Sequence, residues 1–347
     1  MITTIQEWVP GSFPIPFFQT WCCEHSAVTP SSAGASIWSE LDSAGLPPKM
    51  NDCVRGNLVL NRVGVDCIHY LFHDADCREF IAREYPPDVL MAYDLLIPTA
   101  FKADLWRYCV LYKYGGVYLD AKYGLGGPLR EIVERFFGGG GGGDGGDGGD
   151  VFVLERDAVG LWPPGHHGIH NAFMIVRPKS PILLECIYRI VSAAKNGWYA
   201  RGGLDDDYSA GWMTRPLFVT GPGLLGDVWR EGPVVVLDSY ATMAPYFRFF
   251  FEGDGVIGYY NDDDSYVQIF KVYDGYQDEY RHMMSHRNCV PHYTVLWARG
   301  LVWGGSAPSD GGGFRPPTAG TSFDRPVGVS APATQQPHDN QSHILNV

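Results

Sequence analysis

Between residues 102 and 123, hydrophobic and polar positions follow a helical period and then switch to a strand pattern. Leu105, Cys109 and Tyr112 recur at intervals of four and three residues, which places them on one face of a helix. Two adjacent glycines at positions 115–116 end this pattern, and the β-prone run VYL follows directly. The sequence therefore predicts a helix, a tight turn and a short strand.

Three charged residues are placed around this unit. Asp104 and Arg107 are three residues apart on the predicted helix, so they share a face away from the apolar stripe. Asp120 follows the last residue of the predicted strand. A carboxylate, a guanidinium and a strand-end carboxylate held by a short turn suit a ligand with many hydroxyls and a charged group.

Other hydrophobic segments predict further strands and helices. Residues 15–21 (IPFFQTW) and 171–176 (NAFMIV) are expected to be buried strands, and the apolar period of residues 181–196 predicts a covering helix. Trp21, at the end of the first strand, either stacks on the flat ring of a ligand or packs in the core. Asn171 is a polar residue leading a buried strand, so it needs a partner, either a ligand or a neighbouring loop.

Glycine-rich segments mark a turn and an insert. The TGPG motif at residues 220–223 predicts a turn that opens a helix. Its backbone amides, with Gly221 at the turn, face a phosphate or an acceptor hydroxyl, unless the glycines serve packing alone. Residues 138–150 are almost pure glycine, which predicts a flexible surface insert. The polar residues 304–347 predict a disordered tail, and one folded domain is expected over residues 1–303.

Composition narrows the class of partner. Of the 347 residues, 45% are hydrophobic, which is enough for a large core. The net charge is −13 without any basic block, so nucleic acid is not an expected partner. We find no long apolar run and no basic start typical of a secretory signal, and expect no transmembrane segment. The expected location is cytoplasmic, or the Golgi lumen if an N-terminal anchor is missing from the gene model.

The pattern A-D-x-x-R-Y followed by Y-G-G-x-Y-L-D resembles the DXD-containing sugar-binding region of the family 32 glycosyltransferases. The segments IPFFQTW, NAF, TGPG and PHYTVLW are similar to further segments of that family. The resemblance implies an α/β fold of the GT-A type, with a Rossmann-like mixed central sheet flanked by helices. It also implies a retaining glycosyltransferase that moves a hexose from a UDP- or GDP-sugar to a glycan, glycolipid or protein acceptor.

The same resemblance implies roles for individual residues. Asp104 and Arg107 match the pair that binds hydroxyls of the donor sugar, and Asn171 matches an asparagine close to that sugar. Asp120 matches the first acid of the DXD motif, which contacts the donor and its metal, expected to be Mn²⁺. His292 matches a C-terminal histidine that completes the metal site; from the residues alone, it is equally a histidine satisfied by backbone.

One position departs from the family pattern, because Lys122 stands where DXD has its second acid. An ammonium here either binds the diphosphate directly, or turns away and leaves Asp120 and His292 with water to hold the metal. We favour the metal because Asp120 is kept. The departure also supports an alternative function, a catalytically weak or inactive module that binds nucleotide sugars or glycans.

Overall fold

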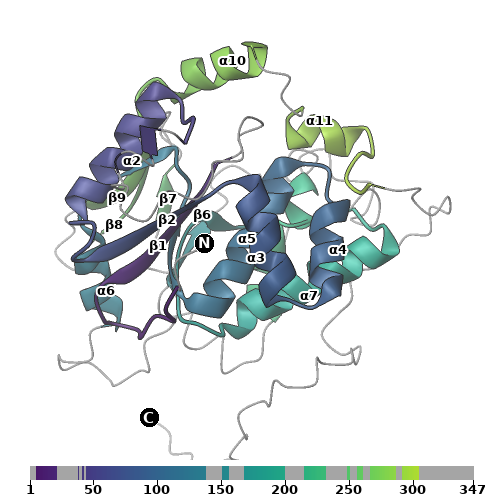
Figure 1. The fold of residues 1–347 in the computed structure, drawn as a ribbon, viewed down its shortest axis with the longest axis horizontal. Helices are drawn as coiled ribbons and strands as arrows, with labels where there is room; N and C mark the ends of the chain where they lie inside the picture. Colours follow the sequence, from purple (N-terminus) through teal and green to yellow (C-terminus); the bar gives the residue numbers. More distant parts are fainter. Residues whose placement is uncertain are drawn as a thin grey trace, which may run out of the picture.

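The computed structural model describes residues 5–21, 38, 41–42, 44–137, 151–155, 168–199, 215–231, 248–250, 256–260, 266–286 and 291–304 (Figure 1). The predicted glycine insert at 138–150 and the tail from residue 305 lie outside the described residues. The extent of the single domain, residues 1–303, stays a prediction.

A mixed five-stranded sheet forms the centre of the described fold. Its order is β2-β1-β3-β6-β5. The strands are β1 (Ile15–Thr20), β2 (Cys67–Phe72), β3 (Gly116–Leu119), β5 (Val151–Glu155) and β6 (Gly168–Val176). Strand β1 runs parallel to both β2 and β3, whereas β6 is antiparallel to β3 and to β5. The predicted strands at 15–21 and 171–176 are thus β1 and most of β6, and the prediction of a mixed central sheet is confirmed.

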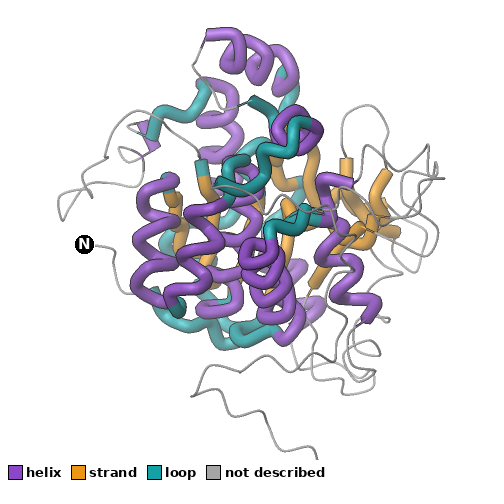
Figure 2. Tube along the Cα trace, turned by 90° about the vertical axis from the view of Figure 1, so that its right-hand side faces the viewer, coloured by secondary structure: helices purple, strands orange, loops and turns teal. Residues whose placement is uncertain are grey.

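Helices cover both faces of this sheet (Figure 1). On one side are α3 (Asp74–Glu84), α4 (Pro87–Leu95), α5 (Thr99–Tyr114), α7 (Pro181–Asn196) and α8 (Pro222–Glu231). On the other are α2 (Pro48–Leu60) and α6 (Leu129–Phe137). Figure 2 looks onto the first of these helical layers, with strands behind it. The described helices are completed by η2 (Arg215–Phe218), α10 (Tyr276–His286) and α11 (Tyr293–Ala298).

Successive residues of the central strands belong to the two different cores. Phe18 and Tyr118 pack with α3, α4, α5, α7 and α8, whereas their neighbours Phe17 and Val117 pack with α2 and α6. A strand directs successive side chains to opposite faces, so a sheet covered on both faces needs apolar residues at every position. This explains why β3 is buried along its whole length.

A second sheet is antiparallel and follows the order β4-β9-β8-β7. Its strands are β4 (Tyr123–Leu125), β7 (Arg248–Phe250), β8 (Val256–Tyr260) and β9 (Tyr266–Val272). Only three residues separate the end of β3 from the start of β4, so the tripeptide 120–122 connects the two sheets. The Tyr123 amide donates to the Asp120 carbonyl at 3.0 Å, which closes a turn around this tripeptide.

The two glycines after α5 are required by backbone conformation and space. Gly115 and Gly116 have φ values of 65° and 103°, a region that L side chains rarely adopt. A Cβ atom on Gly116 would lie 2.4 Å from the carbonyl oxygen of Pro16 in β1. The glycine turn therefore allows β3 to pair with β1 and delivers the end of β3 to a fixed place.

The predicted helix is α5, and it is buried on more than its apolar stripe. Leu105 and Cys109 are fully buried as expected, and the polar residues Asp104 and Arg107 are also buried, although not completely. The polar face is covered because α5 packs against α7, and because strand β6 and the turn before α8 contact its charged residues. The polar groups must consequently find their partners inside the protein.

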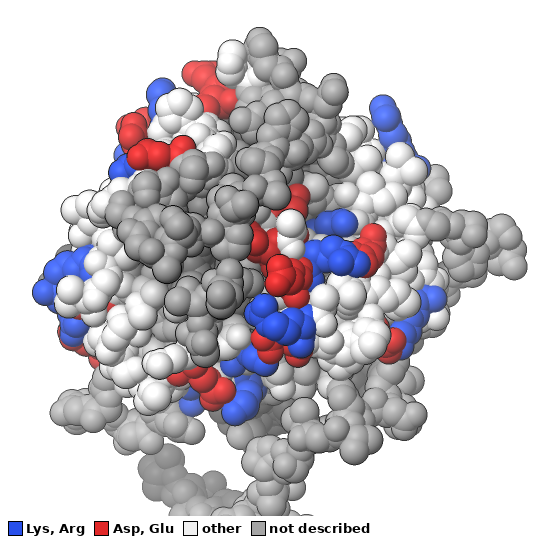
Figure 3. All heavy atoms as spheres, in the orientation of Figure 1, with Lys and Arg blue, Asp and Glu red and all other residues white. Residues whose placement is uncertain are grey.

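Two further features of the structure concern nucleic acids and membranes, namely the distribution of surface charge and the length of the apolar helices. Figure 3 shows Lys and Arg interspersed with Asp and Glu on the face in view, without a continuous basic patch among the described residues there. Within the ranges that the structure describes, no helix is long and apolar enough to cross a membrane.

Candidate active site

Three of the predicted site residues, Asp120, Trp21 and Asn171, lie at one edge of the central sheet. Asp120 follows the carboxyl end of β3, and Trp21 follows the carboxyl end of the parallel strand β1. Asn171 lies in β6, whose antiparallel course returns it to this edge, and the Asp120 amide donates to the Ala172 carbonyl at 2.9 Å. In α/β sheets, ligands bind beyond the carboxyl ends of the parallel strands. The topology thus brings together residues that are far apart in the sequence.

Asp104, on α5, is held mainly by neutral donors. The Asn171 side-chain amide donates to Oδ1 at 2.9 Å, and the Thr220 hydroxyl donates to Oδ2 at 2.8 Å. One guanidinium nitrogen of Arg107 lies 3.3 Å from Oδ1. Burial raises the pKa of Asp104 above its usual value, and the charge of Arg107 only partly offsets this effect. Asp104 is therefore a buried acceptor whose charge is weakly compensated.

Arg107 connects the two acids of the site. Its Nη1 donates to the Asn171 carbonyl at 2.8 Å and lies 3.3 Å from Asp120 Oδ1, while Nη2 faces Asp104. The guanidinium also stacks on the Tyr118 ring, with Cζ 4.3 Å from the ring centroid. A planar fork with several fixed donors suits this bridging position better than a point charge would.

Asp120 is held by cations and a phenol. The Tyr118 hydroxyl donates to Oδ1 at 2.6 Å, and the Lys122 ammonium lies 3.1 Å from Oδ2. Burial acts to raise the pKa of Asp120, but Lys122 and Arg107 outweigh it and lower the pKa to about 2. Asp120 is therefore ionised throughout the physiological range, in contrast to the weakly compensated Asp104.

Among the predicted site residues, the structure brings Asp104, Arg107, Asp120, Asn171 and Lys122 into one network. The buried partner of the Asn171 side chain is the Asp104 carboxylate on helix α5, and not a neighbouring loop. Whether these residues also contact a sugar stays a prediction.

Gly221 has a role in packing that the sequence left open. Its amide donates to the Leu217 carbonyl at 3.1 Å, so this amide is not available to a phosphate. A Cβ atom at Gly221 would lie 3.4 Å from Asp104 Oδ2 and 3.3 Å from the Leu217 carbonyl oxygen. The glycine therefore lets the turn before α8 approach Asp104 closely, which places the Thr220 hydroxyl on the carboxylate.

Trp21 and His292 lie outside the hydrogen-bonded network just described. The Trp21 indole N–H is buried and has no hydrogen-bond partner within the described part of the chain. His292 is the N-cap of α11, where its Nδ1 lies 2.8 Å from the Thr294 hydroxyl. Burial, and secondarily the charge of Lys122, lower the pKa of His292, which favours the neutral form of this imidazole.

Three functional candidates were missed by the sequence reasoning. Tyr108 accepts from the Asn171 amide at 3.1 Å and donates to the Thr220 carbonyl at 2.8 Å. Tyr118 supports Asp120 and Arg107, and Thr220 supports Asp104. The two tyrosines belong to the A-D-x-x-R-Y and Y-G-G-x-Y-L-D patterns, and the threonine opens TGPG. Their places in these sequence patterns could have indicated that the three residues belong to the site.

The residues at this site do not fit a divalent cation. Within the ranges that the structure describes, no three His, Cys, Asp or Glu side chains group in a way that could hold a metal ion. Both Asp120 oxygens are already engaged, one by Tyr118 and Arg107 and the other by the Lys122 ammonium. A metal ion on this carboxylate would lie against two positive charges.

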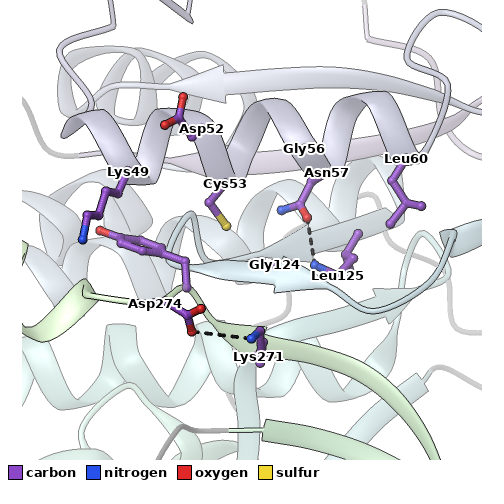
Figure 4. A pocket seen from close by; sticks show the side chains of 11 residues that line it. Lys49, Asp52, Cys53, Gly56, Asn57, Leu60, Gly124, Leu125, Lys271 and Asp274 are labelled. Atoms are coloured by element: carbon purple, nitrogen blue, oxygen red, sulfur yellow. Dashed lines mark hydrogen bonds and ion pairs between the residues drawn. The ribbon is translucent and has the colours of Figure 1, made fainter.

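A cavity of about 600 Å³ lies elsewhere, between α2 and strands β4 and β9 (Figure 4). Lys49 and Lys271 lie at its rim, and Lys271 pairs with Asp274 at 3.5 Å. Asn57 in its wall is occupied structurally, because its carboxamide oxygen accepts from the Leu125 amide. None of the predicted site residues lines this cavity.

Part of the chain that contains this site is similar in sequence to a known family. Residues 52–136 match the sequence model of the family described as "Glycosyltransferase sugar-binding region containing DXD motif". This stretch includes Asp104, Arg107, Asp120 and Lys122, so the resemblance inferred from the sequence is confirmed for this part of the chain.

Two curated relatives are similar over short stretches. The chain is 46% identical over 59 residues to the Schizosaccharomyces pombe inositol phosphoceramide mannosyltransferase 3, covering 17% of this chain and 16% of the relative. It is 40% identical over 57 residues to the Candida albicans initiation-specific alpha-1,6-mannosyltransferase, covering 16% and 15%. The matches thus span about a sixth of the length of these relatives.

Among solved structures, the chain is similar to the PaToxG glycosyltransferase. The superposition covers 66% of this chain and 74% of that chain, with a TM-score of 0.38 and 14% sequence identity.

Proposed function

We propose that the protein is a retaining glycosyltransferase of the GT-A type that transfers a hexose from a nucleoside diphosphate sugar to a glycan, lipid or protein. The observation that carries the proposal is the buried Asp104–Arg107–Asp120 network at the carboxyl edge of the central sheet. It lies within the stretch that matches a glycosyltransferase sugar-binding region.

The network has acceptor capacity left for a sugar. A carboxylate offers about four acceptor positions. Asp104 uses them for Asn171, Thr220 and Arg107, which leaves room for one sugar hydroxyl. The support from fixed neighbours pre-organises this acceptor before the donor arrives, which lowers the entropic cost of orienting the sugar.

The state of the two acids supports retention of configuration. An inverting reaction needs a general base, and among the described residues Asp104 and Asp120 are not free for this role because both are held by internal partners. In the proposed step, the bond between C1 and the diphosphate oxygen breaks and its electron pair leaves with the diphosphate. The acceptor oxygen bonds to C1 from the same face, and its proton passes to the leaving diphosphate.

The leaving diphosphate needs positive charge in the transition state. In DXD glycosyltransferases, a divalent metal, Mn²⁺ in the prediction made from the sequence, has this role. In this chain the charge next to Asp120 is the Lys122 ammonium. The nucleotide base would lie near the end of β1, where the buried Trp21 indole N–H has no partner among the described residues.

A panel of UDP- and GDP-hexoses, assayed for released nucleoside diphosphate, tests the proposal. Both curated relatives are named as mannosyltransferases, so a mannosyl donor heads the panel. We expect release from at least one donor, loss of release in Asp120→Asn, and wild-type release in Asp94→Asn, which changes an exposed acid on α4. NMR of the product is expected to show the anomeric configuration of the donor.

A binding module without transfer is the second candidate, and the replacement of the second DXD acid by Lys122 favours it. Under that alternative, calorimetry detects binding of a nucleotide sugar, but no nucleoside diphosphate appears with any donor or acceptor. A product of inverted configuration would contradict the retaining mechanism while leaving the transferase assignment intact.

A further inference from the structure

The ammonium of Lys122, which stands at the sequence position of the second DXD acid, pairs with Asp120. It lies 3.1 Å from Asp120 Oδ2 and 5.1 Å from the centroid of the Tyr123 ring. The turn that connects the two sheets fixes its backbone, because the Lys122 carbonyl accepts from the Tyr273 amide at 3.1 Å. The fixed backbone and the contacts with Asp120 and Tyr123 thus direct the Lys122 side chain towards the carboxylate, and it does not turn away.

Lys122 combines a fixed charge with access to a ligand. Its side chain is 30% exposed and that of Asp120 is 21% exposed, whereas that of Arg107 is only 7% exposed. An ammonium carries three donors, and the contact with Asp120 uses one of them. Within the described part of the chain, two N–H groups of Lys122 thus remain for phosphate oxygens beyond the sheet edge.

We propose that Lys122 replaces the divalent metal, so that the protein binds the diphosphate of its donor without a metal ion. This inference rests on the proposed function. When the C1–O bond breaks, the negative charge appears on a diphosphate oxygen, and the Lys122 ammonium stabilises it by a charge-assisted hydrogen bond. Lys122 keeps its own protons throughout, and Asp120 acts as a positioning residue that holds the ammonium in place.

The first test measures the binding of Mn²⁺. Bound Mn²⁺ is detected as a loss of the free-ion signal in electron paramagnetic resonance. The proteins are wild type, Asp120→Asn and Lys122→Asp, the last of which restores a D-x-D pattern. We expect wild type and Asp120→Asn to bind equally little Mn²⁺, and Lys122→Asp to bind at least tenfold more tightly than wild type. A Mn²⁺ site in wild type that disappears in Asp120→Asn overturns the proposal.

Binding of GDP and UDP, measured by calorimetry, is the second test. We expect wild type to bind one of them with the same affinity in EDTA and in Mn²⁺. Lys122→Met keeps the length of the side chain and removes its charge, so it is expected to weaken binding by roughly tenfold or more. Lys271→Met, on the neighbouring strand β9, is the matched control and is expected to bind as wild type does.

Several results of this second test would overturn the proposal. They are failure of wild type to bind either nucleotide in EDTA, restoration of binding by Mn²⁺, and unchanged affinity in Lys122→Met. Circular dichroism establishes that Lys122→Met is folded, and Lys122→Arg is expected to recover part of the affinity because it restores the charge.

The readouts separate this proposal from the proposed function. If no nucleotide sugar is cleaved but GDP or UDP binds in EDTA through Lys122, the transferase fails and the metal-free site stands. If a donor is cleaved only with added Mn²⁺, the transferase stands and the role of Lys122 fails.

Discussion

The two ends of the Arg107 guanidinium face two carboxylates with opposite surroundings. Asp104 is 8% exposed and receives hydrogen bonds from neutral groups of Asn171 and Thr220. Asp120 lies at the turn between the sheets, where Lys122 adds a second positive charge. The same residue type thus has a raised pKa at one end and a lowered pKa at the other.

Under the proposed function, this difference suits the two acids to different parts of the donor. A carboxylate held mainly by neutral donors can accept a further hydrogen bond from a hydroxyl, which suits the neutral part of a sugar. A carboxylate that fixes an ammonium presents positive charge outward, which suits a diphosphate. Asp104 and Asp120 do not pair with each other, because Arg107 lies between them and pairs with both.

The largest effect is expected from removing Arg107, because both acids depend on it. Arg107→Met leaves two carboxylates without their shared buried cation, which typically costs about 3–5 kcal/mol of the free energy of unfolding. Urea denaturation measures this loss. Arg78→Met, which breaks the exposed pair with Asp94, is the control and is expected to change stability far less. Equal effects of the two substitutions would show that Arg107 is not the link between the acids.

The hydrophobic pattern of the sequence predicted the relative placement of those site residues that are close together in the chain. Asp104, Arg107 and Asp120 belong to one helix, turn and strand, so spacing and the glycine pair were enough to place them together. Thr220 is 116 residues from its partner Asp104. Its contact depends on how α8 packs against β6, and no local pattern contains that information.

Two further features depended on tertiary structure. The direction of the Gly221 amide follows from its bond to the Leu217 carbonyl, which a TGPG motif alone does not specify. The second sheet was not predicted, because its short strands are recognisable only once β4 pairs with the distant strand β9. The central sheet was predictable because its strands are nearly continuous apolar runs.

An intermediate effect is expected at the neutral end of the site. Thr220→Val removes the hydroxyl that donates to Asp104 Oδ2, and a hydrogen bond to a charged group contributes about 1.5–3 kcal/mol. Thr20→Val removes a bond of similar length to a neutral carbonyl, that of Phe72, for which about 0.5–1.5 kcal/mol is typical. Urea denaturation at pH 7 compares the two.

The pH dependence of this comparison has a definite sign. The Thr220 hydrogen bond lowers the pKa of Asp104, so its removal raises that pKa further. The extra loss of stability in Thr220→Val is therefore present at neutral pH and shrinks as the pH falls and Asp104 takes up a proton. A loss that is the same at pH 4 and pH 7 would show that Asp104 does not change its protonation state between these two pH values.

The smallest effect concerns the titration of Asp120 itself. Its pKa is lowered from the usual 3.8 to about 2, so the stability it contributes is present above pH 3.8 and is lost as the pH falls towards 2. Lys122→Met removes one of the charges that lower this pKa, and we expect the titration to move up towards 3.8. The carboxyl ¹³C shift of Asp120, assigned with Asp120→Asn, follows it, and Lys271→Met is expected to leave it unchanged. A wild-type Asp120 that titrates near 3.8 would mean that Lys122 does not rest on this carboxylate, and the contrast between the two acids would then depend on burial alone.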